Sequence, residues 1–104
     1  MNNTTQIKNF DIENGLGKIS FSPELITNII KKVLSSFNGY EYVSHTIETV
    51  HSNYYEFSIR IKAPNGRLNF KELDRLQKEM LIVMKQSLSL TCVVVINVDN
   101  GKQN

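Results

Sequence analysis

The chain lacks the residues on which several protein classes depend. Among its 104 residues there is one cysteine, Cys92, so no disulfide can form within the chain, and this pattern favours a reducing compartment. The longest apolar runs fall far short of the about 20 residues that cross a membrane as a helix. Residues 1–10 lack the charged start and apolar stretch of a signal peptide. We therefore expect a cytoplasmic chain without a membrane span.

The sequence also has little net charge. Twelve Lys and Arg residues stand against ten Asp and Glu residues, and the net charge of +2 does not by itself indicate a nucleic-acid partner. The hydrophobic fraction of 40% is typical of a globular domain. We expect one α/β domain over residues 17–98, after a flexible arm (residues 1–16) and before a polar tail (residues 99–104). The loose alternation of Ile7, Phe10 and Ile12 leaves open an edge strand within the arm.

Capping residues predict two helices. Ser22 followed by Pro23 is a strong start signal, and apolar residues fill about half of a helix over residues 23–37, which Gly39 would end in a left-handed conformation. Asn69, with Glu72 three residues later, resembles a capping box and begins a helix over residues 70–88.

The remaining apolar segments predict strands over residues 18–21, 40–50, 54–63 and 91–98. The last of these is apolar on both faces, which is typical of a central strand. The resulting order is β-α-β-β-α-β. Because crossovers between parallel strands are right-handed, we expect an α/β (α+β) fold with a mixed sheet and both helices packed on one of its faces.

No residue pattern points to catalysis. The stretch Gly15–Ser20 is short of a phosphate-binding loop, because Ile12 stands where that loop needs glycine. His45 and His51 lie six residues apart in a predicted strand, which separates them by about 20 Å, too far to share a metal. Cys92 lies in an apolar run, where it should behave as a small buried hydrophobe. We expect no catalytic residue, no cofactor, no metal and no enzymatic activity.

An RNA-binding module is the alternative. The element order resembles that of KH and other small RNA-binding folds, although the Gly-x-x-Gly loop of KH domains is absent between the helices. Several tyrosines could stack on bases. The candidate nucleic-acid contacts are Lys31, Lys32, Lys62 and Arg67.

One stretch carries a family resemblance. The residues Gly17–Ile26 (GKISFSPELI) resemble the opening of the bacterial alkaline shock protein family, a general-stress group common in Gram-positive bacteria. Gly39 past the first helix, the long second helix and the final aliphatic strand extend the resemblance over residues 17–98. The first helix departs from it, because the family has more Ala and Gly where this chain has Ile and Lys. The resemblance implies a small non-enzymatic protein that forms assemblies, in some members at the membrane through an anchored partner.

The leading hypothesis is therefore a stress-related interaction or scaffold protein at the cell envelope, with a protein partner or self-association. Ile82 projects from the otherwise polar face of the second helix, which makes it one candidate contact. The sheet face away from the helices is the other candidate surface. We expect it to carry Val93 and Val95, with some of Tyr42, Tyr54 and Arg60.

Overall fold

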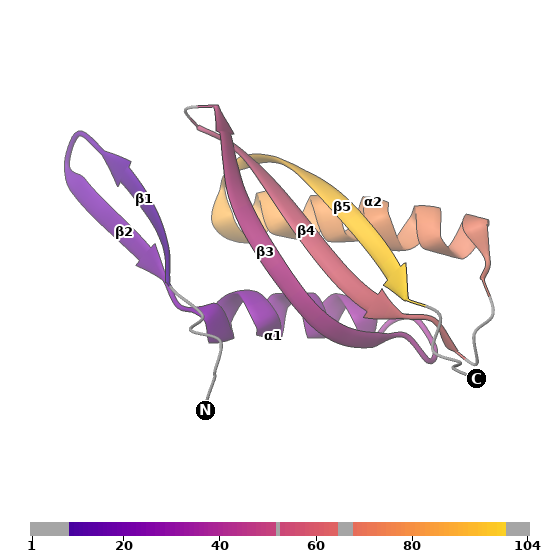
Figure 1. Cartoon of the computed structure of the whole chain (residues 1–104). Coiled ribbons are helices and arrows are strands. Elements are labelled where there is room, and N and C mark those ends of the chain that lie inside the picture. Colours follow the sequence, from indigo (N-terminus) through magenta and orange to yellow (C-terminus); the bar gives the residue numbers. More distant parts are fainter. Residues whose placement is uncertain (1–8, 52, 65–67, 100–104) are drawn as a thin grey trace.

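The structure is a computed structural model that describes residues 9–51, 53–64 and 68–99. Its elements are β1 (Phe10–Asn14), β2 (Gly17–Phe21), α1 (Pro23–Leu34), β3 (Glu41–His51), β4 (Tyr54–Lys62), α2 (Phe70–Leu88) and β5 (Thr91–Asp99). Both helices lie on one face of the mixed sheet β3-β4-β5, while β1 and β2 form a separate hairpin (Figure 1). The predicted fold class, a small α+β domain with two helices on one face, is confirmed.

The strand order differs from the prediction in one respect. β4 is the central strand, paired antiparallel with β3 and parallel with β5. The prediction that residues 91–98 form a central strand is wrong, because β5 lies at an edge of the sheet. The β3–β4 hairpin occupies one side of β4 and the α2 crossover brings β5 to the other, while β2 pairs with β1 instead of extending the sheet.

The expected flexible arm over residues 1–16 contains a strand and therefore needs correction. β1 pairs with β2 from Phe10↔Phe21 to Asn14↔Gly17. Phe10 anchors the hairpin, because its ring stacks on Phe21 at 6.0 Å and meets the edge of Tyr55 at 5.1 Å. Residues 1–8, and residues 100–104 of the expected tail, lie outside the described part of the chain, and Asp99 is the last residue of β5.

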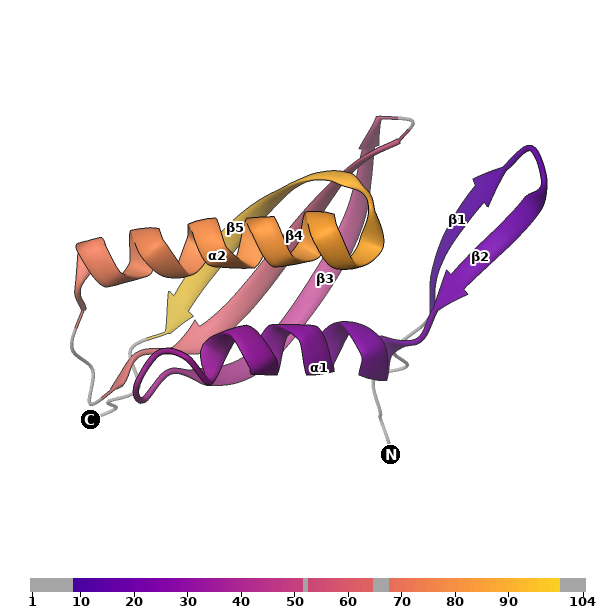
Figure 2. The same ribbon diagram turned by 180° about the vertical axis from the view of Figure 1, so that it is seen from behind.

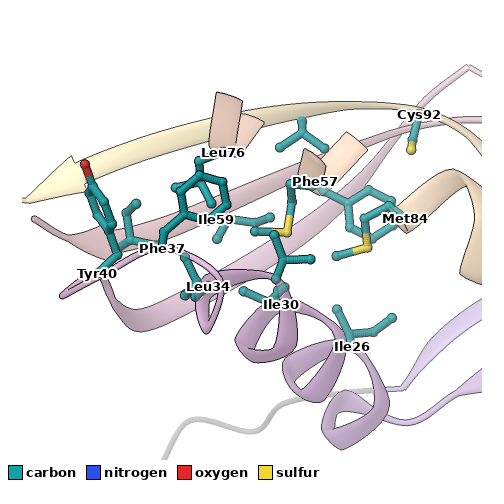
Figure 3. Packing of buried hydrophobic residues seen from close by; sticks show 14 of the residues in the cluster. Ile26, Ile30, Leu34, Phe37, Tyr40, Phe57, Ile59, Leu76, Met84 and Cys92 are labelled. Atoms are coloured by element: carbon teal, nitrogen blue, oxygen red, sulfur yellow. The ribbon is translucent and has the colours of Figure 1, made fainter. Parts of the chain in front are cut away.

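The core lies between the helices and the sheet (Figure 3). β4 alternates strictly, so every second side chain faces the helices; these are Tyr55, Phe57, Ile59 and Ile61, all buried. Ile26 and Ile30 from α1 and Leu76, Met80 and Met84 from α2 complete the fully enclosed centre. Burying each such side chain stabilises the fold by about 1.5–3 kcal/mol.

The two helix starts follow the predicted capping. Ser22 Oγ accepts the Leu25 N–H at 3.2 Å, and Asn69 Oδ1 accepts the Glu72 N–H at 3.1 Å. Glu72 does not close the predicted capping box within the helix. Its carboxylate instead accepts the Tyr40 hydroxyl at 3.1 Å, which ties the start of α2 to the start of β3.

The end of α1 is earlier than predicted. The helix stops at Leu34, and the next residues form a turn in which the Phe37 N–H donates to the Leu34 carbonyl. Gly39 adopts the expected positive φ, at 85°, four residues beyond the cap. A Cβ at this position would lie 2.5 Å from Pro64 Cβ, so the turn requires glycine for both its backbone angle and its space.

Candidate interaction surfaces

The open face of the sheet carries most of the predicted contacts. Because side chains alternate along strands, the register places Tyr54 and Arg60 of β4 on the face away from the helices, together with Val93 and Val95 of β5. Val95 is 37% exposed. The valines therefore lie where the sequence predicted, next to a polar neighbourhood.

Charged residues dominate the rest of the open face. Arg60 Nη1 lies 2.7 Å from Asp99 Oδ1, so the arginine is already engaged at the carboxyl end of β5. Glu48 stands directly opposite Glu56 in the β3–β4 ladder, and Glu41 stands opposite Lys62. Apolar side chains on this face are thus concentrated on β5.

Tyr42 lies on the other face. A register shift between Tyr42 and Ser44 inserts Val43 as an extra residue in β3, so Tyr42 and His45, three residues apart, both point to the helices. Tyr42 Oη and His45 Nδ1 are 2.8 Å apart, and the Lys31 ammonium stands 5.7 Å from the centre of the Tyr42 ring. Burial lowers the pKa of His45 below its ordinary value of 6.5. Tyr42 therefore does not contribute to the open face.

Ile82 has the predicted surroundings. Its side chain is 49% exposed on α2. It lines a shallow hollow of about 430 Å³ together with Ser36, Phe37, Arg75, Lys78 and Glu79. The Arg75 guanidinium stands 5.5 Å from the centre of the Phe37 ring, which closes one side of this hollow. Ile82 is thus a single exposed aliphatic side chain among charged neighbours.

The outer edge of β5 is a feature that the sequence did not reveal. The Asp99 carbonyl accepts the Ala63 N–H at 3.2 Å, so the peptide groups of residue 99 face β4. Peptide groups alternate in direction along a strand. Those of Cys92, Val94, Ile96 and Val98 therefore point outward, away from β4. In agreement, the Val94 carbonyl accepts the side-chain amide of Gln77 from α2 at 2.9 Å.

A hollow of about 450 Å³ runs beside this edge, between β5 and the first turns of α2. Phe70, Leu73, Ile96 and Val98 supply its apolar lining, with Asp74 and Gln77 at its polar side. Phe70 is 81% exposed, a high value for an aromatic side chain in a helix. The outward peptide groups of β5 and an apolar hollow thus lie side by side.

The β1–β2 hairpin projects from the body of the domain, as the views from both sides agree (Figures 1 and 2). Its polar face is paired internally, because Asp11 accepts the Ser20 hydroxyl and lies 3.8 Å from Lys18. Its apolar face becomes more exposed toward the tip. Phe10, Ile12 and Phe21 pack partly against the core, whereas Ile19 is 51% exposed and Leu16 is fully exposed.

The candidate nucleic-acid contacts do not share one surface. Lys31 and Lys32 are exposed in the last turn of α1, on the helix side of the sheet. Lys62 ends β4 on the opposite, open face, in the same row as Glu41 and Asp99. Arg67 lies outside the described residues. The tyrosines are divided as well, since Tyr40 is buried against Glu72 while Tyr54 lies on the open face.

The groups considered for chemistry are placed as follows. Cys92 is 4% exposed, and burial raises the pKa of its thiol. Within residues 9–51, 53–64 and 68–99, the His, Cys, Asp and Glu side chains form no group of three or more that could hold a metal ion. Neither of the described helices combines the length and apolarity needed to cross a bilayer.

Comparisons with models of known protein families, with curated proteins and with solved structures give no match for this chain. The surfaces described above therefore rest on their own geometry. Of these, the hairpin had a usable sequence signal, because Asn14-Gly15 lies between the alternating pairs Phe10/Ile12 and Ile19/Phe21. The outward edge of β5 had none, since it depends on which strand lies beside it.

Proposed function

We propose that this chain is a non-enzymatic interaction or scaffold protein that acts through protein–protein contacts. The observation that carries the proposal is the projecting β1–β2 hairpin, whose apolar face continues from the core into solvent. A two-stranded hairpin is marginally stable by itself. Here Phe10 fixes its base to the core while Ile19 and Leu16 remain exposed beyond it. Contiguous exposed apolar surface of this kind usually marks a binding site for a partner.

The sequence resemblance to the alkaline shock family gives this proposal its setting. It favours a stress-related role in the cytoplasm, peripheral to the cell envelope through a membrane-anchored protein. The hairpin is the element best suited to that contact. Its internally paired polar face leaves the apolar face for the partner.

An affinity capture from a lysate of the source cell tests the proposal. The wild type is compared with the double variant Leu16→Ser/Ile19→Thr, with and without nuclease treatment, followed by mass spectrometry of the bound material. Val43→Thr is the matched control, because Val43 is also an exposed aliphatic residue in a strand, 40% exposed. We expect envelope proteins to bind wild type and control in both arms and to be lost with the double variant.

The RNA-binding interpretation predicts a different outcome. Bound material would then disappear with nuclease, remain with the hairpin variant, and be lost with Lys31→Glu/Lys32→Glu, because phosphate contacts dominate such binding. That result would replace the proposal with the RNA-binding alternative.

A further inference from the structure

We propose that β5 pairs with β5 of a second copy of this chain, antiparallel and across a two-fold axis, so that two three-stranded sheets join into one. This inference rests on the proposed function, because it names one protein partner and would present two hairpins on one particle. The site of contact is the outer edge of β5 with the hollow beside it, and it shares no residue with the hairpin.

The backbone of β5 supplies the donors and acceptors that such pairing needs. Cys92, Val94, Ile96 and Val98 point their N–H and C=O groups outward, as the Asp99 and Val94 hydrogen bonds establish. In an antiparallel pair, outward residues of one strand exchange hydrogen bonds with outward residues of the other. Each of the four would donate one bond and accept one, in a row that continues the regular β4–β5 ladder.

The register follows from the length and charge of the strand. A two-fold axis at Val95 overlaps all nine residues, Thr91 through Asp99, with their counterparts in reverse order. It sets Val95 opposite the second copy's Val95, and Asp99 opposite the hydroxyl of Thr91. No two like charges meet, because Asp99 is the only charged residue of β5. An axis at Val94 or Ile96 leaves residues of the strand beyond the overlap.

The side chains on the helix face are also complementary in this register. Ile96 lies opposite the second copy's Val94, and Val98 lies opposite its Cys92. These incoming aliphatic and thiol groups reach the hollow that Phe70, Leu73, Ile96 and Val98 line, which has about 450 Å³ of space. Strand addition of this kind takes its affinity from the backbone and its specificity from such alternate side chains.

Gln77 is the one group that must move. In the single chain its amide caps the outward carbonyl of Val94, which the second copy's Ile96 N–H would otherwise bind. Gln77 is an exposed side chain on α2, so it can turn to solvent as the second strand enters. A backbone donor then replaces a side-chain donor at the same carbonyl.

A charge-complementation experiment tests both the contact and its register. Val95 is partly exposed on the open face, so a charged side chain fits there without entering the core. We expect the wild type to sediment as a dimer in analytical ultracentrifugation. Val95→Lys and Val95→Glu would each bring like charges together at the axis and raise the dimer dissociation constant at least about tenfold. An equimolar mixture of the two variants should form a heterodimer again.

Thr46→Lys is the matched control. Thr46 lies on the same face and at the same level of the sheet, opposite Ser58, but on the other edge strand. Its dimer should match that of the wild type. A wild type that stays monomeric at about 100 µM, well above the concentrations at which standard-size interfaces assemble, would overturn the proposal. So would a dimer that both Val95 variants retain, or one that Thr46→Lys disrupts.

Native-state hydrogen exchange gives a second readout. The amides of Ile96 and Val98 should be protected in the wild type and exchange quickly in Val95→Lys, while those of Val95 and Asn97, which face β4, stay protected in both. Fast exchange of Ile96 and Val98 in the wild type contradicts the pairing. The hairpin variant Leu16→Ser/Ile19→Thr should remain dimeric, so loss of its envelope partner and loss of the β5 contact are separate results.

Discussion

The two edges of the main sheet differ in how they meet solvent. β3 is interrupted twice, by register shifts between Tyr42 and Ser44 and between Thr49 and His51, and it carries Glu41 and Glu48. β5 pairs in regular register along its whole length and has no charge before Asp99. Bulges and charges are the devices with which natural proteins prevent edge-to-edge pairing.

This difference indicates that the two edges have different roles. β3 has the features of an edge that is kept single, whereas β5 has the straight, apolar character of a strand that has a neighbour. The apolar pattern of residues 91–98, typical of an interior strand, agrees with an interior position that a second copy would create. The predictions below concern the shared central strand first, then the β3 side alone.

The largest effect is expected from Phe57→Ala in β4, which supports both edges. Phe57 is completely buried, and removing a buried phenyl ring costs about 3–5 kcal/mol of unfolding free energy. Urea denaturation at one fixed protein concentration measures it. Val50→Ala in β3 is the control, because Val50 is 46% exposed and should cost less than about 1 kcal/mol. Equal losses in the two variants would contradict the assigned core.

A smaller loss is expected where the chain enters β3. Gly39→Ala combines a positive φ with a Cβ that would lie 2.5 Å from Pro64 Cβ, so we expect a destabilisation of about 1–3 kcal/mol. Gly15→Ala is the control, since an added Cβ there meets no atom within 4 Å. Thermal unfolding of the two variants decides the point, and the turn is wrongly described if both melt like the wild type.

His45 should make stability depend on pH from the β3 side. Because burial lowers its pKa in the fold, the unfolded chain binds a proton more readily. Stability should therefore be constant above the unfolded value of about 6.5, fall as the pH drops below it, and level off below the folded pKa. His45→Gln should flatten that fall in urea titrations between pH 5 and pH 8. His51→Gln, at an exposed position, should leave it unchanged.

Local signals in the sequence were sufficient for the elements and the fold class. The caps at Ser22 and Asn69 and the alternation over residues 54–63 predicted α2 over its full length and β4 to within one residue, because short-range chemistry decides such features. Three features were beyond that reach. The extra residue Val43 reverses the facing of Tyr42, and nothing in the alternation of residues 40–50 marks where it lies.

The other two features concern neighbours in space. An apolar pattern on both faces of residues 91–98 does not record which strand lies beside them, so the edge position of β5 was missed. Gln77 appeared as a polar position on a helix, and its bond to the Val94 carbonyl depends on how α2 lies over β5. Ile82, Val93 and Val95 were placed correctly because helix and strand periodicity alone determines their facing.

The smallest effects are expected from the charges that distinguish β3 from β5. Glu48 stands opposite Glu56, so Glu48→Lys replaces a like-charge pair with an opposite one and should stabilise the fold by about 0.2–1 kcal/mol. Glu41 stands opposite Lys62, so Glu41→Lys creates a like-charge pair and should destabilise it by a similar amount. Both changes add the same charge to the same strand, so their opposite signs isolate the cross-strand pairing from the net charge. Urea denaturation in low salt measures the difference, which should shrink in 1 M salt, where the screening length is about 3 Å. Effects of the same sign in both variants would mean that net charge, and not the register of β3 with β4, governs this edge.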